Sequence, residues 1–324
     1  MSEAAYPPPV EFSVRLTPPD LDPWIAGNCG VSGFLTRESG RPGPHVALVS
    51  LIHGNEYAGA IVLDALLRKD FRPLRGQLTF AFANLAAFAR FDPKQPAASR
   101  YVDEDLNRVW DEAVLEGPRR SCELDRAREM RRIFDTVDFL LDLHSMLWPS
   151  EPLILCNNTE KARELALAIA EPPLVVVDPG HANGRRLIDY ARFRTPHSAA
   201  AANLIEAGQH WQQQTVSITF AAVAKFLRIT GLAAMDDPIL PRPPAEPRPP
   251  RLAEVTAHIV ALTDAFRFVE PFEGGRIVPD EGTLIAWDGE AEIRTPYDNC
   301  LLVMPSLLPR RGHTAVRLAR FVSQ

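Results

Sequence analysis

Residues 45–56 read HVALVSLIHGNE, and this stretch decides the class of fold. Its run 46–52 is apolar except for Ser50, which is typical of a strand that is buried on both faces in a parallel sheet. Residues 57–69 follow as YAGAIVLDALLRK, where Val62, Ala65 and Leu66 recur at helical spacing. A buried strand that leads directly into a helix is the repeating unit of α/β folds.

The same alternation continues along the chain. Further strands are predicted in residues 77–88, 137–145, 152–157, 173–178 and 201–209, and helices in 121–137, 161–171 and 215–232. Ser121 is a suitable N-cap for the first of these helices, and residues 77–88 are expected to end in a loop. We therefore predict an α/β fold, in which a mainly parallel mixed sheet is flanked by helices.

A proline-rich segment divides the chain. Residues 238–250 (PILPRPPAEPRPP) contain seven prolines, which break helices and cannot donate to a sheet. Short apolar runs separated by Gly, Pro and Asp turns follow, as in a small, mostly β domain. We predict a catalytic domain with a proline-rich N-terminal arm at 1–236, a linker at 237–250 and a C-terminal β domain at 251–324. A polyproline recognition role is the alternative to a plain spacer.

Composition narrows the class of protein. The 324 residues are 46% hydrophobic and 23% charged, which suits a globular protein of about two domains and excludes a collagen, a coiled coil or a wholly disordered chain. The net charge of −6 argues against a nucleic-acid partner. Four widely spaced cysteines form no CxxC pair, which argues against a cysteine zinc site. Because we see no signal-peptide pattern and no membrane-length apolar run, we expect a cytoplasmic protein with no membrane partner. Assembly into a homo-oligomer is possible and is left open by the sequence.

Polar residues follow two of the predicted buried strands. His53 and Glu56 come just after the first strand, and His144 ends another. Ligands bind beyond the carboxyl ends of strands in open α/β sheets, and two histidines with one glutamate can hold zinc and leave a fourth position open. A lone histidine is more often a core or surface residue, so the prediction of one Zn²⁺ per chain depends on the convergence of all three.

The stretch 100–110 (RYVDEDLNRVW) is a second polar region. The guanidinium groups of Arg100 and Arg108 offer a planar fork that binds a carboxylate through two hydrogen bonds. The alternative is that these arginines pair with the neighbouring acidic residues 103–105 on a surface loop.

Four motifs in order resemble the succinylglutamate desuccinylase/aspartoacylase family, which is related to the zinc carboxypeptidases. They are HGNE (53–56), DLNR (105–108), DLH (142–144) and the E-x-G motif that begins at Glu206 in LIEAGQH. The resemblance covers most of residues 45–210. It extends into the C-terminal region, which carries a similar G-x-x-V…G-x-x-I-A…P-x-D…M-P pattern.

The resemblance implies a role for each matching residue. His53, Glu56 and His144 match the zinc ligands, and Glu206 matches the general base that activates water. Arg100 matches an arginine that polarises the scissile carbonyl.

The resemblance also implies how the substrate carboxylate is held. Asn107 and Arg108 match the pair that grips this carboxylate, and Arg194 stands upstream of Glu206, as a second carboxylate-binding arginine does in aspartoacylase. Tyr297 is the candidate for a tyrosine that the family supplies from its C-terminal domain.

These expectations define a first hypothesis and two alternatives. The first is a zinc-dependent hydrolase that cleaves the amide bond of a small, carboxylate-bearing N-acyl amino acid. The segment Ser145–Trp148 (SMLW) departs from the polar residues of aspartoacylase and hints at a more apolar substrate. The alternatives are a zinc carboxypeptidase, which needs an open groove for a peptide, and a non-catalytic metal- or ligand-binding protein. Asp142 is a candidate partner of His144 on the same strand face, and His210 is a candidate for the pocket wall.

Overall fold

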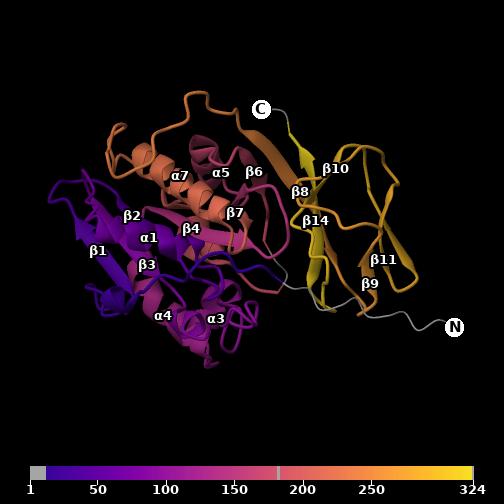
Figure 1. Cartoon of the computed structure of the whole chain (residues 1–324), viewed down its shortest axis with the longest axis horizontal. Helices are drawn as coiled ribbons and strands as arrows, with labels where there is room; N and C mark the ends of the chain where they lie inside the picture. The colour runs from indigo at the N-terminus through magenta and orange to yellow at the C-terminus, as the bar shows by residue number, and fades with distance from the viewer. Residues whose placement is uncertain (1–11, 181–182, 323–324) are drawn as a thin grey trace.

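The computed structural model describes residues 12–180 and 183–322, and its centre is an 11-stranded sheet (Figure 1). The prolines of the predicted N-terminal arm at 7–9 lie outside the described residues. In spatial order the strands are β1 (Phe34–Glu38), β3 (Gln77–Phe82), β2 (His45–Ser50), β4 (Phe139–Met146), β7 (Ala201–Gln209), β5 (Leu153–Cys156), β6 (Leu174–Val177), β8 (Arg251–Val260), β14 (Thr314–Phe321), β13 (Cys300–Val303) and β10 (Ile277–Val278).

The middle of this sheet is parallel. Strands β3, β2, β4 and β7 all run in one direction, whereas β5 is antiparallel to β7 and parallel to β6. The predicted α/β class with a mainly parallel mixed sheet is confirmed. Parallel neighbours bring their carboxyl ends to one edge, and this is the edge that carries the candidate site.

Helices cover both faces of the sheet because its strands are apolar on both sides (Figure 1). On β2, Leu48 belongs to the core shared with α1 (Ala58–Arg68), α5 (Glu160–Ile169) and α7 (Gln213–Ile229). The next residue, Val49, belongs to the core on the other face, which α4 (Cys122–Phe134) covers. This alternation explains why the strands are continuous apolar runs in the sequence.

Local capping sets where two helices begin. Ser121 caps α4 as predicted, and its side chain accepts a hydrogen bond from Leu124 N at 3.0 Å. The predicted loop after β3 instead contains a short helix, α2 (Leu85–Phe88), because the Asn84 side chain accepts from Ala87 N at 3.1 Å. The remaining short helices are α3 (Glu112–Glu116) and α6 (Ala191–Arg194).

The C-terminal region is rich in antiparallel strands, as predicted. No helix or strand interrupts residues 238–250. Strand β8 then pairs with β6 on one side and β14 on the other, so β8, β14, β13 and β10 extend the central sheet. A second, antiparallel sheet contains β12 (Ala291–Arg294), β11 (Leu284–Asp288) and β9 (Phe266–Phe268). Within residues 12–180 and 183–322, the helices are too short or too polar to cross a membrane.

Candidate metal centre and active site

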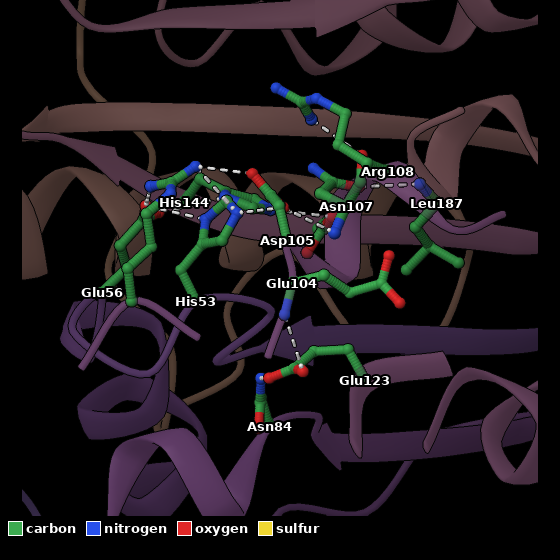
Figure 2. Close-up of polar contacts among 12 residues, drawn as sticks. His53, Glu56, Asn84, Glu104, Asp105, Asn107, Arg108, Glu123, His144 and Leu187 are labelled. Carbon is green, nitrogen blue, oxygen red and sulfur yellow. Dashed lines mark hydrogen bonds and ion pairs between the residues drawn. The ribbon is translucent and has the colours of Figure 1, made fainter. Parts of the chain in front are cut away.

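The three predicted metal ligands meet at the carboxyl edge of the parallel strands (Figure 2). His53 and Glu56 lie in the turn that joins β2 to α1, and His144 lies near the end of the adjacent strand β4. One ligand atom from each residue lies within 4.8 Å of the others. All three residues are at most 4% exposed, so the cluster is shielded from solvent.

A carboxylate lies beside the second nitrogen of each histidine. Nε2 of His53 is 2.9 Å from Oδ1 of Asp105, and Nε2 of His144 is 2.9 Å from Oδ2 of Asp142. This arrangement leaves both Nδ1 atoms beside Glu56, at 2.8 and 3.0 Å from its carboxylate oxygens. Carboxylates in such positions fix the ring orientation of metal-binding histidines. The expected Asp142–His144 contact is present, whereas the Asp105–His53 contact was not predicted.

Arg100 closes the same network. It donates from Nη1 to Oε1 of Glu56 at 2.9 Å and from Nη2 to Oδ2 of Asp105 at 3.3 Å. Burial disfavours its charge, but the carboxylates of Asp105 and Glu56 outweigh burial and raise the pKa of Arg100. The surface-loop alternative therefore holds only in part, because Asp105 pairs with Arg100 at the metal ligands.

The donor set fits a divalent cation. Three buried carboxylates, those of Glu56, Asp142 and Glu206, and the partly buried carboxylate of Asp105 gather here, and Arg100 pairs with Glu56 and Asp105. Burial opposes charge on His144, yet the carboxylates of Asp142 and Glu56 raise its pKa well above the usual value. His53 Nδ1 lies close to Glu56 but has no hydrogen-bond partner among the described residues, as expected of an atom that faces a shared cation.

Glu206 lies next to this cluster. Parallel pairing of β4 and β7 places it directly opposite His144. It is 6% exposed, and its Oε2 atom has no hydrogen-bond partner among the described residues. Burial and the nearby Glu56 charge raise the pKa of Glu206 to about 8. An unpartnered buried carboxylate beside a metal site is suited to proton transfer.

Glu123 holds the loop that carries Arg100 and Asp105, a role that sequence reasoning missed. This fully buried carboxylate accepts from the backbone N–H groups of Val102, Asp103 and Glu104 at 2.6, 3.0 and 3.2 Å, and from the side chain of Asn84 at 2.9 Å (Figure 2). Its place in the first turn of α4 makes it look like an ordinary helix-dipole residue, which is why the sequence alone gives no signal.

A cavity of about 130 Å³ opens beside the cluster. His53, Glu56, Arg100 and Glu206 form its polar side. The rest of its wall combines apolar and small polar residues, which are Ser145, Met146, Leu147, Trp148, Ser150, His210, Met304, Pro305 and Ser306. Trp148 and His210 are therefore pocket residues, and the segment Met304–Ser306 brings the C-terminal region to the site.

A wider groove of about 1140 Å³ lies nearby, between the loop Pro149–Pro152, the start of α7 and the loop Glu270–Arg276. It shares Ser150 with the smaller cavity. The described residues that line it include none of the three candidate metal ligands and not Glu206.

The predicted carboxylate-binding pair lies beyond Asp105. Figure 2 shows Asn107 and Arg108 on the other side of Asp105 from His53. Asn107 accepts from Leu187 N at 2.8 Å through its side-chain oxygen, and Arg108 donates to Asn107 O at 2.7 Å. Burial and the charges of other arginines outweigh Asp105 and lower the pKa of Arg108 to about 10. Neither Asn107 nor Arg108 is among the described residues that line the small cavity.

The structure does not bring Arg194 or Tyr297 to the site. Arg194 ends α6, which precedes the first residue of β7, and the neighbouring Arg192 donates to Val137 O just before β4 begins. Arg194 therefore lies at the amino ends of the strands, opposite Glu206. Tyr297 lies 2.5 Å from Thr256 Oγ1 through its hydroxyl, away from the residues that line the cavity.

Comparison with known proteins agrees with this fold and site. The succinylglutamate desuccinylase/aspartoacylase catalytic domain matches residues 42–230, so the chain belongs to this family of deacylases. No curated protein matches the sequence.

Solved structures share the fold at low sequence identity. The succinylglutamate desuccinylase of Vibrio parahaemolyticus is 18% identical with a TM-score of 0.67, over 90% of this chain and 87% of the other. A succinylglutamate desuccinylase/aspartoacylase from Rhodobacter sphaeroides is 17% identical with a TM-score of 0.66, over 90% and 89%. The product-bound ectoine utilization protein EutE (DoeB) of Ruegeria pomeroyi is 16% identical with a TM-score of 0.63, over 88% of each chain. These structures support the fold of both the sheet and the C-terminal strands.

Proposed function

We propose that this protein is a zinc-dependent amidohydrolase that removes the acyl group from a small, carboxylate-bearing N-acyl amino acid. The observation that carries the proposal is the convergence of His53, Glu56 and His144 beside the unpartnered carboxylate of Glu206. We propose one zinc ion per chain, held by these three residues. When bound, zinc in such a site lowers the pKa of a water molecule and polarises a carbonyl.

Glu206 acts as the general base in this proposal. It takes a proton from the attacking water and delivers it to the nitrogen of the leaving amine. Its Oε2 atom is buried and makes no hydrogen bond to the described residues, and the residue lines the cavity in which substrate and water would meet. A serine or cysteine nucleophile is not needed for this sequence of steps.

Arginines orient the substrate. Arg100 lines the cavity and is fixed by Glu56 and Asp105, so it can donate to the scissile carbonyl oxygen. Among the described residues, the Arg108 side chain makes one hydrogen bond, to a backbone oxygen, which leaves donors for a substrate carboxylate. Because the side-chain oxygen of Asn107 is held by Leu187 N, we assign Asn107 to positioning this loop as well as to carboxylate binding.

The cavity favours a small substrate over a peptide. Met304, Pro305 and Ser306 restrict the space next to the ligands, and the wider groove does not contain the ligands or Glu206. These observations disfavour the carboxypeptidase alternative. The presence of both the ligand set and the base disfavours a protein that only binds a metal or ligand. We keep as proposals the cytoplasmic location and the division into a catalytic part, a linker and a C-terminal part.

The test is amine release from a panel of N-acyl amino acids and short peptides. Zinc-loaded wild type is compared with Glu206→Gln, and the metal content of both proteins is measured. We expect the wild type to cleave an N-acyl amino acid, and the variant to keep zinc but lose about 10²- to 10⁴-fold in turnover. Cleavage of peptides alone would instead support a carboxypeptidase, and full turnover by the variant would exclude Glu206 as the base.

A further inference from the structure

Two cavity residues have no place in the mechanism above, His210 and Ser145. His210 follows β7 and is 3% exposed, and Ser145 is 4% exposed. Nδ1 of His210 lies 2.7 Å from Oγ of Ser145. Both side chains line the cavity that contains Arg100 and Glu206. A polar pair in the cavity wall is placed to contact a ligand that enters the cavity.

The imidazole ring of His210 is held in place from several sides. Its backbone N–H donates to Met146 O at 2.8 Å. Its ring packs on Trp211, with the ring centroids 5.1 Å apart, and Trp211 Nε1 donates to Asn55 O at 3.0 Å. The pairing of β4 and β7 shifts register just after His144 and Glu206, and such irregularities re-aim side chains next to active sites.

The hydrogen bond to Ser145 sets the tautomer of His210. Within the described residues, the Ser145 hydroxyl has one possible acceptor, Nδ1 of His210. If the Ser145 hydroxyl donates to Nδ1, its hydrogen is paired and Nδ1 carries no proton. The ring proton must then lie on Nε2. The ring is then neutral, and burial, which lowers the pKa of His210 to about 4, acts in the same direction.

The second ring nitrogen remains available to a ligand. Nε2 of His210 has no hydrogen-bond partner among the described residues, and the side chain lines the cavity. Arg100 also lines the cavity and is assigned above to the scissile carbonyl oxygen, so His210 would be a second donor to that oxygen. His210 therefore adds a neutral N–H donor to a wall that also contains the apolar side chains of Met146, Trp148 and Met304.

We infer that His210 is a substrate-binding residue whose Nε2–H donates a hydrogen bond to the acyl oxygen of the amide and of its carboxylic acid product. Ser145 positions it by fixing the tautomer. This inference rests on the proposed deacylase function for the identity of the ligand. A neutral donor suits an uncharged carbonyl oxygen, because the bond needs no counter-charge within a buried wall.

The first test uses ¹⁵N-labelled histidine and NMR of the zinc-loaded protein, which requires no turnover. The His210 signals are assigned by their absence in His210→Gln. We expect the Nε2–H tautomer in wild type and a mixture with the Nδ1–H tautomer in Ser145→Ala. Addition of acetate, as the probe for the acid product, is expected to shift the Nε2 signal. An Nδ1–H tautomer in wild type, or no effect of acetate, would overturn the inference.

A matched pair of variants separates the donor from the ring's shape. His210→Gln keeps an N–H donor, whereas His210→Phe keeps a ring without one. With zinc content and unfolding midpoint confirmed as unchanged, acetate is expected to bind about five- to tenfold more weakly to His210→Phe than to His210→Gln. Equal affinities would show that the ring only fills space, and if His210→Phe does not fold, Ser145→Ala supplies the test. If the panel of N-acyl amino acids is not hydrolysed while the acetate differences persist, the proposed function fails but the hydrogen bond stands.

Discussion

Two buried clusters of charged side chains differ in how their charges are balanced. At the candidate metal centre, four carboxylates, those of Glu56, Asp105, Asp142 and Glu206, gather around two histidines, and Arg100 is the arginine that pairs directly with two of them. The second cluster lies where the C-terminal strands join the main sheet, and there Asp178 and Asp189 face Arg186 and Arg317. The first cluster has the ligand atoms to hold a cation from outside the chain, whereas the second pairs its carboxylates with its own arginines.

The geometry of the second cluster fits a structural role. The Asp178 carboxylate accepts from Arg317 Nε at 2.8 Å, and it lies 3.3 Å from Arg186 Nη1 and 3.2 Å from His258 Nε2. These partners come from β14, from the segment before Tyr190 and from β8, so one carboxylate ties three parts of the chain together. Removal of one partner from a buried ion pair leaves an uncompensated charge, whereas an excess of one sign is typical of a site for a ligand.

Loss of a metal ligand should have the largest effect. In His144→Ala we expect zinc content to fall from one ion per chain to none and turnover to disappear, because only two protein ligands remain. Free zinc at about 100 times its dissociation constant should raise the unfolding free energy of wild type by about 2.7 kcal/mol and leave the variant unchanged. Metal analysis and urea unfolding with and without zinc measure both effects.

The control is another histidine of the same sheet. His45 lies at the amino end of β2, where its ring contacts Thr79 and Thr136. His45→Gln should retain one zinc ion. A His144→Ala protein that still held a full equivalent of zinc would refute the assigned ligand set.

Substitution at the balanced cluster should affect stability and not zinc. Asp178→Asn leaves Arg186 and Arg317 buried without their shared counter-charge, so we expect a loss of about 3–5 kcal/mol in unfolding free energy. Zinc stoichiometry should stay at one. As a control, Glu254→Gln removes a half-exposed ion pair with Arg163 and should cost less than about 1 kcal/mol. Equal effects of the two substitutions would show that the buried cluster has no special role.

The sequence predicts the parallel sheet and the convergence of the candidate metal ligands for the same physical reason. Strands such as β2 are continuous apolar runs, and a polar residue just after such a run must lie at the sheet edge. His53 and His144 satisfy this rule, so their convergence can be predicted without coordinates. The extension of the sheet through β8 cannot be predicted in this way. Pairing between β6 and β8 joins residues about 80 positions apart across a proline-rich segment.

The positions of the arginines are harder to predict than those of the ligands. Arg194 is close to Glu206 in sequence, but the strand β7 separates them and places them at opposite edges of the sheet. Arg317 is far from Glu206 in sequence, yet its positive charge acts on the pKa of Glu206. Roles such as that of Glu123, which depend on several backbone N–H groups of one loop, leave no pattern of residue types that sequence reasoning can detect.

A change beside a ligand should have a smaller effect than loss of the ligand itself. Asp105→Asn weakens the partner of His53 Nε2 but keeps the size of the side chain, so we expect zinc affinity to fall about 10- to 100-fold. Competition with a chromogenic chelator measures this change. Asp103→Asn is the control from the same loop, because Asp103 accepts from Cys122 N and touches no candidate ligand. An unchanged zinc affinity in Asp105→Asn would mean that the carboxylate does not orient His53.

The smallest expected effect is the pH dependence of the balanced cluster. Burial would raise the pKa of Asp178, but His258, Arg186 and Arg317 together lower it far below the usual value. A carboxylate with a lowered folded-state pKa contributes stability above its unfolded pKa of about 3.9, and loses it as pH falls toward the folded value. The stability difference between wild type and Asp178→Asn should therefore shrink by about 1 kcal/mol between pH 4 and pH 3, measured by urea unfolding at each pH. Residues that titrate identically in both proteins cancel from this difference. A stability difference that stays constant between pH 4 and pH 3 would mean that Asp178 titrates normally. The second cluster would then not be balanced by ion pairing as its geometry indicates.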